Sequence, residues 1–307
     1  MSELCGIFIV DKPVGVTSQV VIGRLRKVTG IRRIGHCGTL DPLASGVLPV
    51  MIGNATKACE YLMDHDKVYV ASIRLGVETD TEDITGEVTA RHEGALPSFE
   101  EFSAAAKTFV GEIDQIPPMY SALKKDGIKL VNLAREGVTV EREPRKVTIH
   151  SLETYEEKGE FFLRVHCSRG TYIRTLCADI GKKLGCGAAM QSLVRTKTGQ
   201  FTLDDCVTVE QLDNMTFEER LALPKTVESL FTDLPEVNIP DYYVKLVRGG
   251  TNLFQKKLKA DFEDGTLLRI RNRDEFIALG RAGTDENGKA VIRPEKLFSL
   301  GEQSAEE

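Results

Sequence analysis

Hydrophobic residues along this chain follow either the pattern of a β-strand or that of an α-helix. The places where one pattern gives way to the other predict the order of strands and helices. Apolar or alternating runs of strand length lie at 4–10, 47–52, 67–75, 147–155 and 160–168. Helix-like patterns, mostly opened by Ser or Thr, lie at 18–29, 55–63, 98–110 and 171–184. We therefore expect strands and helices to be interspersed through the first two thirds of the chain.

Three helix starts carry a more specific signal. Ser98, Thr208 and Thr216 each stand three residues before Glu or Gln, the spacing of a capping box. The two later boxes lie in an acidic stretch that ends near residue 234. That stretch is therefore predicted to be helical.

The hydrophobic pattern changes near 235–240. Beyond it, Gly and Asp separate short alternating runs at 267–270, 275–279 and 290–293, as in a small β domain. We expect a first domain over 1–236 and a second over 237–307. Within the first, residues 115–147 are flanked by prolines and net positive. They are predicted to form either a solvated loop or a mobile insertion that contacts a polyanion.

Composition limits the class of protein. The chain has 307 residues, 41% of them hydrophobic and 28% charged, values typical of a globular protein. No apolar run approaches the roughly 20 residues that span a bilayer, and we expect no secretory signal. The seven cysteines include no Cys-x-x-Cys pair, which favours free thiols in a reducing cytoplasm over a zinc site or a disulfide framework.

Charge is distributed unevenly although the net charge is -6. Residues 12–40 contain six basic side chains and no acidic one, and residues 161–203 contain seven basic side chains and only Asp179. The ten acidic residues of 204–241 more than cancel this excess. Since fields act over roughly 8 Å at physiological salt, a local basic face can attract phosphates on an anionic protein. Solvation of helix faces is the alternative.

The densest cluster of turn-forming residues lies at 35–46, with three glycines, one proline and one histidine among its twelve residues. Asp41 is its only carboxylate and the first after Asp11. On this segment alone, Asp41 is predicted to be a turn former that accepts hydrogen bonds from nearby backbone amides. A chemical role would need groups from elsewhere in the chain.

Four segments supply such groups: Asp11-Lys12-Pro13-x-Gly15-x-Thr17-Ser18, Gly35-His36-x-Gly38-Thr39-Leu40-Asp41-Pro42, Lys67-x-Tyr69 with Leu75-Gly76-x-x-Thr79-Asp80-Thr81-x-Asp83, and Ser168-x-Gly170-Thr171-Tyr172-Ile173-Arg174. In this order they resemble the TruB-type pseudouridine synthases, a bacterial family that makes pseudouridine-55 in the T arm of tRNA. The resemblance covers residues 4–235, and the C-terminal part resembles a PUA domain. It implies an α+β fold with a central mixed, mostly antiparallel sheet flanked by helices, followed by a small β domain.

The resemblance also implies the catalytic residues. The family's aspartate corresponds to Asp41, which attacks or electrostatically supports the sugar or the base. Because burial disfavours an ionised carboxylate, a nearby cation is needed, and the family supplies it as Arg174. Tyr69 matches a tyrosine whose ring stacks on the displaced uracil. On spacing alone, Arg174 could be a helix-surface charge and Tyr69 a core residue. The residues leave open whether Asp41 attacks C1′, attacks the base or supports a glycal intermediate.

Five further residues are placed at the substrate by the same resemblance. His36 matches a residue that enters the space the target base leaves, and Asp83 matches an acid near Arg174 and Tyr69. Lys12 braces the tyrosine region, and Tyr172 belongs to the arginine's motif. Leu193 matches an apolar residue against the flipped base, with core packing as its alternative.

Pseudouridylation involves no redox step and no net hydrolysis, so we expect no cofactor and no metal ion. The implied partner is tRNA, held through its T arm, with the C-terminal domain near the acceptor end. No membrane and no guide RNA are expected, and we expect a cytoplasmic monomer. Two other functions stay open. One is a non-catalytic RNA-binding or chaperone protein with this fold, and the other is the same chemistry on a different RNA.

Overall fold

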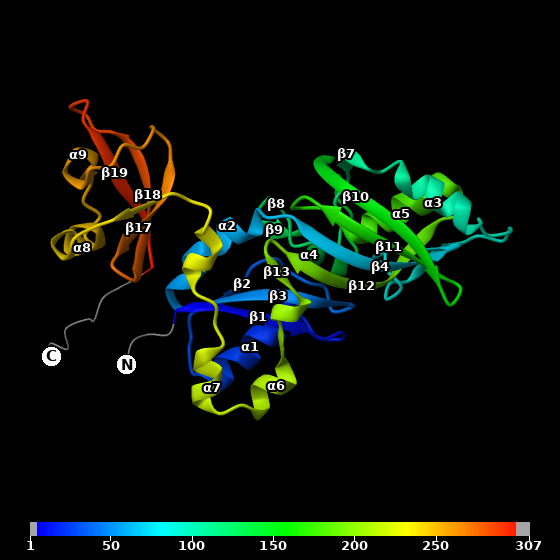
Figure 1. Cartoon of the computed structure of the whole chain (residues 1–307). Coiled ribbons are helices and arrows are strands. Elements are labelled where there is room, and N and C mark those ends of the chain that lie inside the picture. Colours follow the sequence, from blue (N-terminus) through cyan, green and yellow to red (C-terminus); the bar gives the residue numbers. More distant parts are fainter. Residues whose placement is uncertain (1–4, 299–307) are drawn as a thin grey trace.

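Two sheets organise the chain in the computed structural model, which describes residues 5–298 (Figure 1). The larger sheet has ten strands. Its main path runs in the order β14 (Val207–Thr208), β1 (Gly6–Lys12), β3 (Ala44–Ile52), β12 (Ala188–Thr198), β4 (Lys67–Leu75), β11 (Glu160–Cys167), β10 (Arg145–Glu157) and β7 (Gly111–Gln115). Two short strands extend it: β2 (Ile34–His36) pairs with β3, and β13 (Phe201–Thr202) pairs with β12.

Neighbouring strands of the larger sheet are mostly antiparallel. Within the described residues, its parallel pairs are β1 with β14 and β3 with β12. β1 and β3 are buried along nearly their whole length, which explains why both are continuous apolar runs in the sequence. The predicted α+β fold with a mixed, mostly antiparallel sheet is therefore confirmed.

The sequence patterns missed β12, although it lies at the centre of the sheet between β3 and β4. This strand mixes small, apolar, polar and basic residues, so it shows neither an apolar run nor a clean alternation. Two of its polar residues, Arg195 and Thr198, are nevertheless buried. Tertiary contacts, and not local hydrophobic pattern, specify this strand.

Helices pack against both sheets. They are α1 (Ser18–Thr29), α2 (Cys59–Met63), α3 (Phe99–Lys107), α4 (Leu130–Arg135), α5 (Ile173–Leu184), α6 (Val209–Asn214), α7 (Phe217–Ala222), α8 (Asp241–Arg248) and α9 (Gln255–Leu258), with 3₁₀ turns η1 (Gly53–Ala58), η2 (Leu203–Asp205) and η3 (Val227–Phe231). α5 packs on β12 and on α3, and α1 packs on α6 and α7 (Figure 1). Over residues 5–298, no helix is long and apolar enough to cross a membrane.

The three predicted capping boxes are all present. Ser98 caps α3, Thr208 caps α6 and Thr216 caps α7, each with a reciprocal bond from the residue three positions later. The acidic stretch to residue 234 is only partly helical, because it is divided into α6, α7 and η3.

The second sheet has five strands, in the order β15 (Glu236–Asn238), β17 (Leu267–Asn272), β18 (Glu275–Thr284), β19 (Ala290–Leu297) and β16 (Leu253–Phe254). It has a core of its own, to which α8 contributes Val247, and it agrees with the PUA-like module expected here. A boundary between residues 236 and 237 stays a prediction. Residues 299–307 of the expected domain lie outside the described residues.

The two sheets are joined by an aromatic cluster. Phe231 of η3 contacts the rings of Tyr61, Phe276 and Phe298. Polar contacts flank the cluster, including the bond from Lys57 Nζ to the carbonyl of Leu297 at 2.9 Å. The second sheet therefore packs against η1 and α2, which follow β3 of the larger sheet.

Residues 115–147 leave the sheet after β7 and return at β10. They contain the hairpin of β8 (Lys124–Lys125) and β9 (Ile128–Lys129), followed by α4. A second excursion carries the hairpin of β5 (Val77–Thr79) and β6 (Val88–Arg91). Both excursions reach Arg174, as described below.

Candidate active site

The turn between β2 and β3 presents Asp41. Ser18, the first residue of α1, holds this turn because its Oγ bonds both the amide and the carbonyl of Leu40, each at 3.0 Å. The carbonyl of Asp41 accepts from the amide of Ala44 at 3.0 Å, and that of Pro42 accepts from Gly15 at 2.7 Å. The backbone around Asp41 is therefore fixed from two directions, while its side chain stays free to bond elsewhere.

Asp41 forms an ion pair with Arg174, from the first turn of α5. Asp41 Oδ2 lies 3.0 Å from Arg174 Nε, and the side chain of Arg174 is 6% exposed while that of Asp41 is 39% exposed. The other guanidinium nitrogens donate to the carbonyls of Thr81 at 2.9 Å and Tyr120 at 2.7 Å. A buried guanidinium with all three directions engaged is held in one orientation, and it holds the carboxylate of Asp41 through their ion pair.

Asp83 supplies a second, buried carboxylate at the same arginine. Its Oδ2 lies 4.0 Å from Arg174 Nε. Its Oδ1 accepts bonds from the amide and hydroxyl of Thr85 at 2.9 and 2.5 Å and from the hydroxyl of Thr81 at 3.0 Å. These bonds compensate the burial of Asp83. Arg174 therefore lies between the buried carboxylate of Asp83 and the partly exposed carboxylate of Asp41.

Tyr69 and Arg195 stand opposite each other on β4 and β12. Burial raises the pKa of Tyr69, an effect that the charge of Arg195 and a hydrogen bond with Arg195 partly oppose. Arg195 is 1% exposed and donates to the carbonyls of Val47 at 2.8 Å and Gly38 at 3.1 Å. It therefore ties the tyrosine strand to both ends of the turn that carries Asp41.

Arg195 is the residue of this site that sequence reasoning missed. It lies in the basic segment 161–203, but nothing local separates it from its neighbours there. The available signal is its spacing from Leu193, because residues two apart on a strand share a face. That signal requires knowing that 188–198 is a strand.

Lys12 ends β1 and is fully buried. Its Nζ donates to the carbonyls of Pro13 at 2.8 Å and Val16 at 2.7 Å. Burial lowers its pKa to about 8; Arg195 adds to this shift and the charge of Asp41 opposes it. The ammonium therefore lies close enough to Asp41 and Arg195 for their charges to interact.

Leu193 and Tyr172 approach the site from two sides. Leu193 is in register with Ala44 across the parallel pair of β12 and β3, three residues beyond Asp41. The amide and carbonyl of Tyr172 are both bonded by the side chain of Gln115, at 2.8 and 3.0 Å. Burial raises the pKa of Tyr172, a shift that the charge of Arg174 opposes.

Among the described residues, no hydrogen bond or ion pair joins His36 to Asp41 or Arg174. His36 ends β2, and its Nε2 lies 3.2 Å from Nε2 of Gln19 on α1. Its Nδ1 is buried without a hydrogen-bond partner. Burial lowers the pKa of His36, with a smaller effect from Arg195, so the ring is uncharged near pH 7.

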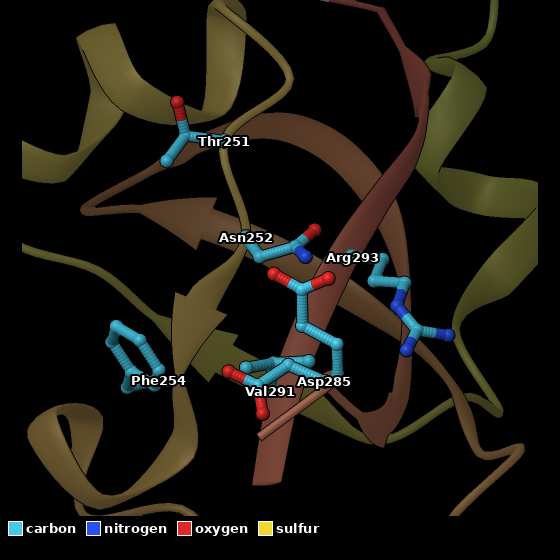
Figure 2. A pocket seen from close by; sticks show the side chains of 7 residues that line it. Thr251, Asn252, Phe254, Asp285, Val291 and Arg293 are labelled. Atoms are coloured by element: carbon cyan, nitrogen blue, oxygen red, sulfur yellow. The ribbon is translucent and has the colours of Figure 1, made fainter. Parts of the chain in front are cut away.

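Two hollows in the described residues lie away from this site. One of about 500 Å³ is formed on the second sheet by Thr251, Asn252, Phe254, Asp285, Glu286, Val291 and Arg293 (Figure 2). Asp285 and Arg293 face it with opposite charges. Asp41 lies in neither this hollow nor the one beside Arg74 and His92.

Family models and sequences of known proteins match most of this chain. Residues 26–173 match the family model for the N-terminal domain of TruB family pseudouridylate synthase, and residues 174–231 match that for the C-terminal domain of tRNA pseudouridylate synthase B. The tRNA pseudouridine synthase B of Syntrophotalea carbinolica is 43% identical over 86% of this chain and 88% of its own length. That of Clostridium perfringens strain 13 is 39% identical over 95% of this chain and 98% of its own.

Solved structures agree. A chain of a Cbf5-Nop10-Gar1 complex superposes with a TM-score of 0.70 and 31% identity, covering 96% of this chain and 85% of that chain. A chain of an H/ACA RNP bound to a substrate RNA containing 2′-deoxyuridine gives a TM-score of 0.68 at 28% identity, covering 96% and 85%. With these relatives, and with the motif residues Asp41, Asp83 and Arg174 brought together, this chain belongs to the TruB family of pseudouridylate synthases.

Proposed function

We propose that this enzyme converts uridine to pseudouridine at position 55 in the T loop of tRNA, with Asp41 as the reacting carboxylate. The observation that carries the proposal is the ion pair between Asp41 and Arg174. Its arginine is buried and held by three partners, whereas its carboxylate is 39% exposed. A carboxylate that is fixed but open to solvent can reach a nucleotide delivered from outside the protein.

In the proposed reaction the bond from C1′ to N1 breaks, the uracil turns, and a bond from C1′ to C5 forms. The proton on C5 then leaves and N1 holds a proton, so the reaction is redox-neutral and isomeric. Asp41 supports the electron-poor sugar, or attacks sugar or base, as the carboxylates of glycosidases do. Arg174 orients Asp41 through their ion pair, and Asp83 is a positioning residue on the same guanidinium.

Tyr69 and Leu193 are proposed to hold the turned base. Tyr69 provides a neutral aromatic face on which a uracil can stack, because burial keeps its phenol protonated near pH 7. Leu193 offers an apolar contact on the neighbouring strand, in register with the turn of Asp41. Lys12 holds the Pro13–Val16 loop, and Tyr172 closes the site beside Arg174.

The target uridine must leave its stack before Asp41 can reach it, at a cost of a few kcal/mol. We propose that His36 enters the space left by the base, since an uncharged ring with an unpartnered nitrogen can stack and bond there. Phosphate contacts from the basic segments 12–40 and 161–203 would offset this cost. A folded RNA loop is recognised largely by shape, which suits the T arm.

Further proposals concern the contacts with the T loop and the acceptor end of tRNA, the oligomeric state of the protein and its location. Residues 115–147 are proposed to contact the T loop, because Tyr120 of this segment already bonds Arg174 at 2.7 Å. The second sheet is proposed to lie near the acceptor end. We further propose a monomer that acts in the cytoplasm without a guide RNA.

The proposal is tested by incubating the enzyme with an unmodified tRNA transcript and mapping pseudouridine at every position. We expect modification at position 55 alone, and none in a transcript with cytidine there. Pseudouridine at another site, or in another RNA but not in tRNA, would contradict the substrate assignment. Binding without modification would favour the non-catalytic alternative.

A further inference from the structure

A cluster of three side chains outside the active site has the arrangement of metal ligands. Asp66, His150 and His166 come from three neighbouring strands or strand ends, at β4, β10 and β11. Their ligand atoms all lie within 4.8 Å of one another. We propose that they bind one Zn²⁺ ion. This inference is independent of the pseudouridylation proposed above.

Strand register explains why the three residues share one face. His166 pairs with Val68 across β11 and β4, and Asp66 precedes Val68 by two residues, so Asp66 and His166 point to the same side. On the other side of His166, the register between β10 and β11 shifts between Ile149 and Ser151. This β-bulge makes His150 the extra residue, so His150 and Ser151 both oppose His166.

The β-bulge places the two imidazole rings in contact, with their centroids 4.8 Å apart. It also turns His150 toward the carboxylate of Asp66. β-Bulges interrupt a strand ladder and often re-aim a side chain at a functional site. Here the re-aimed side chain completes a set of two imidazoles and one carboxylate.

The distances fit a tetrahedral ion. Asp66 Oδ2 lies 3.2 Å from His150 Nε2 and 3.6 Å from His166 Nε2. Zinc bonds of about 2.0–2.1 Å at tetrahedral angles place ligand atoms roughly 3.4 Å apart, between these two values. Small rotations of the imidazoles would bring the remaining nitrogen pair to the same spacing.

The ligand types and their exposure favour Zn²⁺. Imidazole nitrogens with a carboxylate oxygen are a frequent zinc donor set, and three protein ligands leave a fourth position for water. The side chains are 37%, 43% and 46% exposed for His150, His166 and Asp66, so an ion can enter from solvent. Sequence spacing could not reveal the site, because its ligands are far apart along the chain.

The test titrates the full-length chain, freed of metal with a chelator, with Zn²⁺ against a chromophoric competitor. We expect one ion per chain, and binding at least about tenfold weaker in His150→Gln, His166→Gln and Asp66→Asn. The matched control is His92→Gln, because His92 is also exposed but lies outside the cluster. Its affinity should equal that of the unaltered protein.

Two spectroscopic measurements on the unaltered protein keep the test valid if a variant misfolds. Zn²⁺ should shift the imidazole nitrogen resonances of His150 and His166 and leave those of His92 unchanged. Co²⁺ should give visible bands of nitrogen and oxygen coordination without a thiolate charge-transfer band. Absence of binding at millimolar Zn²⁺, equal affinity in all variants, or a thiolate band that shows binding at cysteines would overturn the proposal.

Discussion

Arg174 holds several partners at once, and this determines what its replacement would do. Nε faces Asp41 at 3.0 Å, while the other two nitrogens donate to the carbonyls of Thr81 and Tyr120 at 2.9 and 2.7 Å. A planar guanidinium can bond in three directions in one plane, whereas the ammonium of lysine is a compact point charge. Charge alone therefore cannot reproduce this arrangement.

For Arg174→Lys we expect turnover to fall by about 100-fold or more, with tRNA affinity nearly unchanged, because Asp41 loses its fixed partner. Single-turnover rates and filter-binding affinities measure the two effects separately. Arg273→Lys is the control, since Arg273 forms an exposed pair with Asp241 on the second sheet. A loss that appears wholly as weaker tRNA binding would contradict the role assigned to Arg174.

Lys12 predicts a pH dependence of stability. Burial lowers its pKa from 10.5 to about 8 in the folded protein. Between these two values the unfolded chain binds more protons, so this group makes the free energy of unfolding rise with pH. The unaltered protein should therefore gain stability relative to Lys12→Met from pH 8 to pH 10, as measured by urea unfolding. A constant difference between the two proteins would show that Lys12 is not desolvated.

At the scale of single residues, the sequence predicted which residues belong to the site but not the contacts between them. The resemblance pointed to Asp41 and Arg174, but their ion pair depends on α5 lying against β12, which no spacing reveals. Arg195 escaped notice because buried arginines look like surface ones in a sequence. A buried arginine differs in having backbone carbonyls from other segments as partners, here those of Gly38 in the turn and Val47 on β3.

At the scale of elements, the parallel contact of β3 with β12 connects the turn of Asp41 to the strand of Leu193 and Arg195. Gly46 makes this approach possible. It has a φ of 100°, and a Cβ atom there would lie 2.3 Å from the carbonyl oxygen of Arg195. Only glycine fits both the conformation and the space.

Gly46→Ala should therefore destabilise the protein by about 3 kcal/mol and also slow turnover, because β3 and β12 must separate near the turn. Gly23→Ala is the matched control. Gly23 lies within α1, and a Cβ atom there meets nothing within 4 Å, so alanine should stabilise the helix by about 0.5–1 kcal/mol. Equal effects of the two substitutions on thermal unfolding would contradict this account of Gly46.

Elements with a strong local signal were predicted well, such as the apolar β1 and the capped α3. The failure at β12 has a physical cause. Its central place buries Arg195, whose guanidinium donates to the carbonyl of Val47 on β3 at 2.8 Å. Hydrophobic periodicity does not register a strand whose burial is compensated by hydrogen bonds.

At the scale of the molecule, the aromatic cluster around Phe231 joins the two sheets. Phe231 is 3% exposed and contacts rings from α2, from β18 and from beyond β19. The change of pattern near 235–240 predicted a second β unit, but contacts between the sheets leave no periodic signal. Cutting the chain there would expose this cluster.

Phe231→Ala should cost about 3–5 kcal/mol of stability, and both sheets should unfold in one transition because they share this cluster. Phe217→Ala is the control, because Phe217 is 47% exposed on α7 and its loss should change stability by about 0.5 kcal/mol or less. Calorimetry of the two variants and of the unaltered protein measures both the loss of stability and the number of unfolding transitions. Two separate transitions in the unaltered protein would show that the sheets are independent.

The central claim is that Asp41 performs the chemistry and is not needed to hold the RNA. Its most direct test is release of tritium from tRNA labelled at C5 of uridine, compared between the unaltered enzyme and Asp41→Asn under single-turnover conditions. We predict that Asp41→Asn binds the T arm with similar affinity and releases no tritium above background. Release by this variant within tenfold of the unaltered rate would contradict the role of Asp41.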